Sequence, residues 1–151
     1  MRVDIYQRLS DDETITIDDS LTLDHIQREK GRFKVQSDSG LEMGVFLERG
    51  HVIQLGEVLR SSCGKNIKVL GATESVITAF SGDWGDFCRA CYHLGNRHVK
   101  VQLGEQWLRI IADHVLEDML LKLGLRLQRE QSVFVPESGA YLINSDHAAH
   151  D

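Results

Sequence analysis

Polar and hydrophobic residues alternate in short runs along the first 70 positions of the chain. The alternation predicts strands at 14–17, 32–36, 44–47 and 68–70. Clusters of Asp, Ser and Gly, such as 37–40, separate these runs and are typical of turns. Within this half, only residues 23–30 are expected to form a helical segment, of a single turn or more. The pattern therefore predicts an all-β domain, which we place at residues 1–72.

The pattern changes after Ala72. A β-branched run at 74–80 predicts a strand, and the stretch after it carries apolar residues at helical spacing. Asp83 suits the N-cap of this helix, and Gly95 suits its end. The expected buried stripe of the helix consists of Trp84, Phe87, Cys88, Cys91 and Tyr92.

Two more strands and a second helix are expected next. Strands at 98–103 and 106–111 flank Gly104-Glu105, a pair that suits a two-residue type II′ turn. Asp113 can then cap a helix with one apolar face, and a last strand is expected within 125–135. The order βαββαβ predicts a ferredoxin-like domain, with two helices on one face of a four-stranded antiparallel sheet.

The whole chain is thus expected to have an α+β fold in two small domains. The all-β domain at 1–72 precedes the ferredoxin-like domain at 73–137. Residues 138–151 are expected to form a flexible tail that contains His147 and His150. With 151 residues of which 42% are hydrophobic, each core would be small, so oligomerisation would help the chain to fold stably.

Charge limits the partners that the chain can attract. Its 17 Lys and Arg face 23 Asp and Glu, and the formal net charge of −6 works against attraction to nucleic acid or an anionic membrane. The first eight residues lack the apolar core of a secretory signal, and no stretch approaches the roughly 18 apolar residues that span a bilayer. These features predict a cytoplasmic protein that binds neither nucleic acid nor membrane.

The three cysteines are an odd number in a chain without a secretory signal, so we expect reduced thiols. Cys88 and Cys91 form a CxxC, a spacing found in thiol redox centres and zinc sites. Redox pairs gain a lowered thiol pKa at a helix N-terminus, whereas these two fall in the middle or later part of the expected helix. A second CxxC for a four-cysteine zinc site is absent. Core packing is therefore the favoured interpretation.

No motif for nucleophilic catalysis, phosphate binding or H-E-x-x-H zinc chemistry occurs in the sequence, so we expect the protein not to be an enzyme. The sequence does offer imidazole, with seven His in all. Imidazole suits nickel, zinc and copper, and the affinity order of divalent metals alone does not choose among them.

His98 is the strongest candidate ligand. It is expected to open the strand at 98–103, in which Val99, Val101 and Leu103 face inward and His98 faces outward. A single His is far short of a metal cage, so position alone favours an ordinary surface residue. If two copies pair about a two-fold axis at this face, His98 meets its own copy, and two imidazoles share one ion. Such a site would be incomplete and exchangeable, as a metal carrier requires.

The remaining histidines are weaker candidates. His147 and His150 in the tail could swing over an open site, although a polar chain end without a role fits them equally well. His114, beside Asp113, could form a weak peripheral site, and surface solvation is at least as common an outcome. His93 lies at the end of the first helix, where the helix dipole favours a cation.

One run of residues resembles a known family. Tyr92 to His98 reads Y-H-L-G-N-R-H, which is similar to the signature of the urease accessory nickel chaperones of the UreE family. The run from Asp113 to Leu120 resembles the family's second helix start, and the run from Gly50 to Leu59 resembles a turn of its β domain. The resemblance covers the chain to about Tyr141.

This resemblance implies a homodimeric metallochaperone with nickel as its cargo and His98 as the principal ligand. Its β domain would be similar to the peptide-binding domain of a heat-shock co-chaperone. Nickel would pass to the urease accessory GTPase and then to the apo-urease accessory complex, and zinc or copper could occupy the same site. The tail has only His147 and His150 where some members have many His, so high-capacity storage is not expected. Ala112 stands where some members have a further His, which weakens a site at His114.

Two alternatives belong to other functional classes. A peptide-binding or protein-folding module without metal delivery would depend on the β half alone, and it predicts that His98→Ala leaves function intact. A thiol oxidoreductase would depend on Cys88 and lose its activity in Cys88→Ser.

Overall fold

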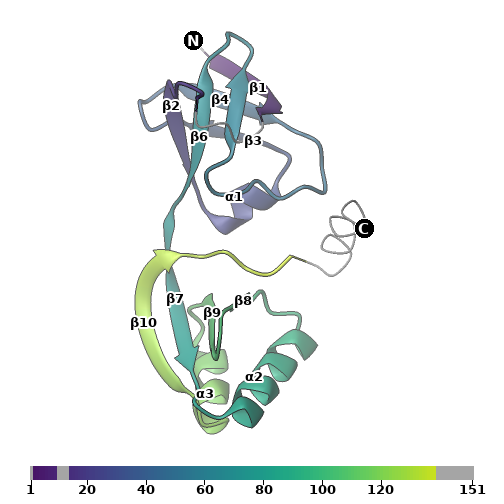
Figure 1. Cartoon of the computed structure of the whole chain (residues 1–151), viewed down its shortest axis with the longest axis vertical. Helices are drawn as coiled ribbons and strands as arrows, with labels where there is room; N and C mark the ends of the chain where they lie inside the picture. Colours follow the sequence, from purple (N-terminus) through teal and green to yellow (C-terminus); the bar gives the residue numbers. More distant parts are fainter. Residues whose placement is uncertain (1, 10–13, 139–151) are drawn as a thin grey trace. The chain divides into compact units, whose positions relative to one another are not determined.

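The computed structural model describes residues 2–9 and 14–138, which divide into two compact units between Ala72 and Thr73 (Figure 1). The first unit contains seven of the described elements: β1 (Arg2–Leu9), β2 (Asp19–Leu23), α1 (His25–Glu29), β3 (Arg32–Gln36), β4 (Glu42–Phe46), β5 (Val58–Ser61) and β6 (Asn66–Gly71). Its six strands form one sheet in the order β2-β6-β5-β1-β4-β3. The expected β half is confirmed.

Alternation along β1 shows why the first unit forms a sheet. Val3 and Ile5 are buried in the core, whereas the alternate residues Arg2 and Asp4 form an ion pair, with 2.8 Å between Nε and Oδ1. The single helix α1 begins at a capping box, in which the Asp24 carboxylate accepts from the Gln27 amide at 2.8 Å. This helix lies within residues 23–30, where the sequence predicted a helical segment.

Two details of the first unit differ from the prediction. The expected strand at 14–17 is absent, and the strand that forms is β2, in which Leu21 and Leu23 are fully buried. Ile17 is 40% exposed, so it does not contribute a core position. The leucine pair of β2 therefore contributes to the core, whereas Ile17 does not. The strand at 32–36 is confirmed as β3.

The second unit has the ferredoxin-like order. Its elements are β7 (Thr73–Phe80), α2 (Trp84–Asn96), β8 (Gln102–Leu103), β9 (Trp107–Ile111), α3 (His114–Lys122) and β10 (Arg126–Val133). The strands form an antiparallel sheet in the order β10-β7-β9-β8 (Figure 1). The predicted βαββαβ fold class is confirmed.

One face of this sheet packs against both helices. Ile77 and Ala79 of β7 are paired with Ile110 and Leu108 of β9, and all four are fully buried. They share a core cluster with residues of the two helices: Phe87, Ala90, Leu94 and Leu120. A side chain that lies next to this cluster is held in place by the rest of the unit.

The opposite face of the sheet carries a polar network that sequence reasoning missed. Arg109 donates from Nε to the Thr78 hydroxyl at 2.9 Å and pairs with the Glu130 carboxylate at 3.1 Å. Thr78, which is 3% exposed, donates to the same Glu130 oxygen at 2.6 Å. Three neighbouring strands, β9, β7 and β10, are thereby joined across the face.

The connection between β8 and β9 is shifted by one residue from the predicted turn. Leu103 is paired with Leu108, and the Gly104 amide donates to the Trp107 carbonyl at 2.9 Å. The turn residues are therefore Glu105 and Gln106, and Gln106 has a positive φ of 57°. Gly104 is needed because a Cβ there would lie 1.9 Å from the Trp107 indole.

The N-cap of α3 provides a direct test of the local structure. The Asp113 carboxylate accepts from the amides of Val115 and Leu116 at 2.9 and 3.0 Å. Asp113→Ala is expected to lower the free energy of unfolding by about 1 kcal/mol, measured by urea denaturation. Asp118→Ala on the exposed side of the same helix is the matched control and should change stability much less. Equal effects of the two substitutions would contradict the capping role.

Candidate metal site at the end of helix α2

Helix α2 carries the candidate ligand at its C-terminal end. Its N-cap is Asp83, whose carboxylate accepts from the Asp86 amide at 3.1 Å, as the sequence predicted. The buried residues of the helix are Phe87, Ala90 and Leu94. Trp84 and Tyr92, which were expected to be buried, are 54% and 69% exposed. The buried face is thus rotated from the predicted stripe.

His98 does not open a strand, so that prediction is wrong. The helix continues through Gly95 to Asn96, and the backbone then closes a Schellman motif in which His98 occupies the C′ position. The Val99 amide donates to the Leu94 carbonyl at 3.1 Å, and the His98 amide donates to the Gly95 carbonyl at 3.0 Å. The following strand begins only at Gln102.

The Schellman motif fixes the backbone of His98 in an unusual conformation. Its φ is +57°, a left-handed value that helix ends usually assign to glycine. Leu94 is fully buried, and Val99 packs against the same core cluster, so both sides of the turn are anchored. Non-glycine residues in this region are uncommon and concentrate at functional sites. The His98 side chain is exposed and so accessible to an ion.

The position of His98 is favourable for a cation. Carbonyl groups at the C-terminal end of a helix give that end a partial negative charge, and Arg97 and His98 directly follow the last turn of α2. His114 stands at the opposite kind of terminus, because it is the first residue of α3 and the amide groups there repel cations. His114 is exposed. Helix electrostatics therefore favour His98 over His114 as a ligand.

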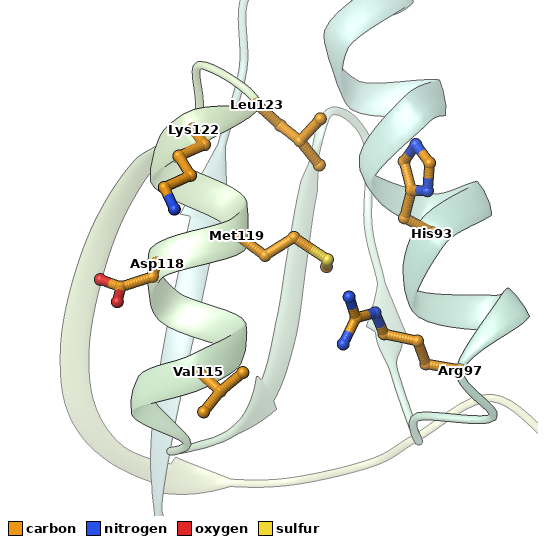
Figure 2. Close-up of a pocket in the computed structure, with 7 residues that line it drawn as sticks. All are labelled: His93, Arg97, Val115, Asp118, Met119, Lys122 and Leu123. Atoms are coloured by element: carbon orange, nitrogen blue, oxygen red, sulfur yellow. The ribbon is translucent and has the colours of Figure 1, made fainter.

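The residues next to His98 and His114 in the sequence line one hollow. Arg97 and Val115, their neighbours in the sequence, face each other across a hollow of about 510 Å³ between α2 and α3 (Figure 2). At the other end of the hollow His93 lies opposite Leu123. Across residues 2–9 and 14–138, no group of three or more His, Cys, Asp or Glu comes together in metal-binding geometry. The described part of one chain therefore offers no complete metal cage.

The tail histidines His147 and His150 lie outside the described residues. The described chain ends at Ser138, and the Glu137 amide donates to the Val101 carbonyl at 2.7 Å. The side-chain carbonyl of Gln102 also accepts from the Val135 amide at 3.0 Å. These hydrogen bonds hold residues 135–137 against Val101 and Gln102, which follow His98 by three and four residues in the sequence.

The cysteines differ from one another in exposure. Cys88 is exposed, so its predicted core packing is wrong, whereas Cys91 is half-buried and packs against the core cluster as predicted. Cys63 of the first unit is exposed, and a hydrogen bond with the Ser61 hydroxyl lowers the pKa of its thiol. No helix among the described residues is long and apolar enough to cross a membrane.

The strain at position 98 predicts an uncommon result for a glycine substitution. His98→Gly relieves the left-handed backbone, whereas His98→Ala keeps the strain and removes the imidazole. The glycine variant is therefore expected to be more stable than the alanine variant by about 1 kcal/mol, measured by urea denaturation of the two proteins without metal. An alanine variant as stable as the glycine variant would show that the turn has a different backbone in solution.

Comparison with known proteins gives the family. The C-terminal domain of UreE urease accessory proteins matches residues 74–151, and the N-terminal domain matches residues 5–72. A urease accessory protein UreE from Marinomonas sp. is 52% identical over 145 residues, which cover 96% of this chain and 99% of that protein. One from Alteromonas mediterranea is 53% identical over 125 residues, covering 83% and 81%. The chain belongs to the UreE family of urease accessory proteins.

Proposed function

We propose that this protein is a nickel carrier for urease maturation, a non-enzymatic metallochaperone that acts in the cytoplasm. Its cargo is a nickel ion held by His98 of two copies of the chain. The accessory GTPase and the apo-urease accessory complex are the proposed recipients. Zinc and copper suit the same imidazoles, so their competition at the site belongs to the proposal.

The observation that carries the proposal is the conformation of His98. Glycine would fit the left-handed turn with less strain, yet the position holds an exposed imidazole whose backbone is fixed by a buried leucine. A cation at this terminus is favoured by the helix dipole. Membership of a family of urease accessory proteins supports a role in urease maturation.

A second copy would complete the site. The residues described in one chain provide no three-ligand group, and a two-fold axis beside His98 would supply a second imidazole. Tyr92 lies on α2 six residues before His98 and is 69% exposed, and exposed aromatic side chains are enriched in protein interfaces. Dimerisation through this end of the domain is the arrangement that we propose.

A tail ligand is a further part of the proposal. His147 follows Glu137 by ten residues, and an extended chain of that length spans about 35 Å. Val101, to which the Glu137 amide is bonded, is only three residues from His98. We propose that His147 or His150 adds an imidazole to the pair of His98 side chains and adjusts the rate at which nickel is released.

Urease activation at limiting nickel tests the proposed function. Apo-urease and its accessory proteins receive nickel only as the loaded protein, and urease activity is followed over time. His98→Gly is expected to support no more urease activation than the same amount of free nickel. His114→Ala should retain most of the activation that the wild-type protein supports. Full activation by His98→Gly would overturn the proposal and favour a role for the β unit that needs no metal.

A further inference from the structure

The CxxC of helix α2 is not used by the proposed nickel site. Free cysteine is among the most buried residue types, yet Cys88 is exposed on the helix surface. Cys91, one turn later, is half-buried at the edge of the core. The helix therefore presents one accessible thiol beside one that is sheltered, which simple core packing does not require.

Helical spacing places the two thiols side by side. Residues three apart on an α-helix have Cβ atoms about 5–6 Å apart on the same face. Burial and the neighbouring Cys88 both raise the pKa of the Cys91 thiol, as expected when a second ionisable sulfur lies close by. Trp84 stands one turn before Cys88 on that face and is 54% exposed, and its indole packs edge-on against Phe87 with 5.9 Å between ring centroids.

We propose that Cys88 and Cys91 form a two-coordinate site for a soft monovalent cation, of which Cu(I) is the physiological example. Thiolates select Cu(I) over harder divalent ions, and two ligands suffice for it. A tetrahedral zinc site would need further donors, and the described residues bring no third His, Cys, Asp or Glu to this pair.

The binding step exchanges protons for metal. Two sulfur–copper bonds form, the two S–H protons pass to solvent, and copper enters and leaves as Cu(I) without a change of oxidation state. Affinity should therefore rise with pH until both thiols are deprotonated. The pair lies about two helical turns before His98, so this soft-metal site is separate from the imidazole site.

Competition for Cu(I) tests the proposal. The purified full chain is titrated without oxygen into the coloured Cu(I) complex of bicinchoninate, and loss of colour reports transfer to the protein. The wild-type protein and Cys63→Ser are each expected to take one Cu(I) per chain. Cys88→Ser should bind about 100-fold more weakly or worse, because the second thiolate acts at a high effective concentration.

A spacing control separates a paired site from the mere number of thiols. Cys88→Ser combined with Arg89→Cys keeps three cysteines but places the pair at i, i+2, positions that do not face each other on a helix. This double variant should bind as weakly as Cys88→Ser. Quenching of indole emission at one equivalent of Cu(I) should be present in the wild-type protein and lost in Trp84→Phe.

Two outcomes would overturn the proposal. The first is a Cys88→Ser variant that retains the wild-type Cu(I) affinity, with circular dichroism showing an intact fold. Alternatively, Cys63→Ser alone could remove the bound ion, which would move the site to the first unit. His98→Gly should bind Cu(I) normally, so failure of the nickel proposal and failure of this one give different results.

Discussion

Replacing His98 by glycine is expected to weaken nickel binding by about 100-fold or more. The substitution removes a direct ligand, and its effect should exceed the roughly 10–100-fold loss of affinity that follows mutation of outer-shell residues. In a site shared by two chains the substitution removes both central imidazoles together. Glycine is the suitable replacement, since it adopts the left-handed backbone of this turn without strain. Calorimetric titration of nickel into the purified protein measures the affinity.

The control for this result is His114→Ala. His114 is exposed at the first position of α3, a terminus that disfavours a bound cation, so its removal should leave the tight binding event in place. A glycine variant that binds nickel as tightly as the wild-type protein would move the ion to the tail or to His114. The family would then be correct and the assigned ligand wrong.

Leu94→Ala is expected to lower the free energy of unfolding by about 3 kcal/mol, the usual loss when a buried leucine side chain is deleted from a core. Leu94 is fully buried among the residues that join α2 to the sheet. Its carbonyl also accepts the Val99 amide that closes the turn at His98. The substitution should therefore weaken nickel binding in addition to stability, through a less firmly held His98.

Leu121→Ala is the matched control for the core substitution. Leu121 lies on α3 and is 53% exposed, so the same change of side chain should alter stability by about 0.5 kcal/mol or less. Urea denaturation of the metal-free proteins measures both effects. Similar losses for the two variants would mean that the core contact of Leu94 does not hold the end of α2.

The helices and most strands of the second unit could be predicted from the sequence because local signals agreed with tertiary packing. Asp83 and Asp113 are N-caps in both the prediction and the structure. The β-branched run at 74–80 and the last strand also formed as expected. The length of β8 was overestimated: a strand was expected at 98–103, and only Gln102 and Leu103 form one. Val99 and Val101 alternate like strand residues, but they pack against the core from the connection between α2 and β8.

The face of α2 could not be predicted from hydrophobicity alone. Counting Trp84, Cys88 and Tyr92 as apolar rotated the expected stripe, whereas the structure buries Ala90 and Leu94. A small residue such as Ala90 lets a helix approach a sheet closely, and single-sequence patterns weigh it too little. The Ala90 and Leu94 spacing of i, i+4 was the signal that could have found the correct face.

The candidate ligand was identified from its motif, and its geometry was not. Glycine at position 95 suggested the end of the helix, but the left-handed residue that ends it is His98, three positions later. Side-chain chemistry can be read directly from a sequence, whereas the backbone state of one residue depends on the turn that encloses it. A ligand from a second copy has no signal in the sequence of one chain.

Native mass spectrometry of the nickel-loaded protein tests the shared site most directly, because it counts chains and ions in one species. The account predicts a species of two chains with one nickel ion, and for His98→Gly the same conditions should give no nickel-bound species. One nickel ion on each single chain, or a nickel-bound dimer of the glycine variant, would contradict a site shared by two His98 side chains.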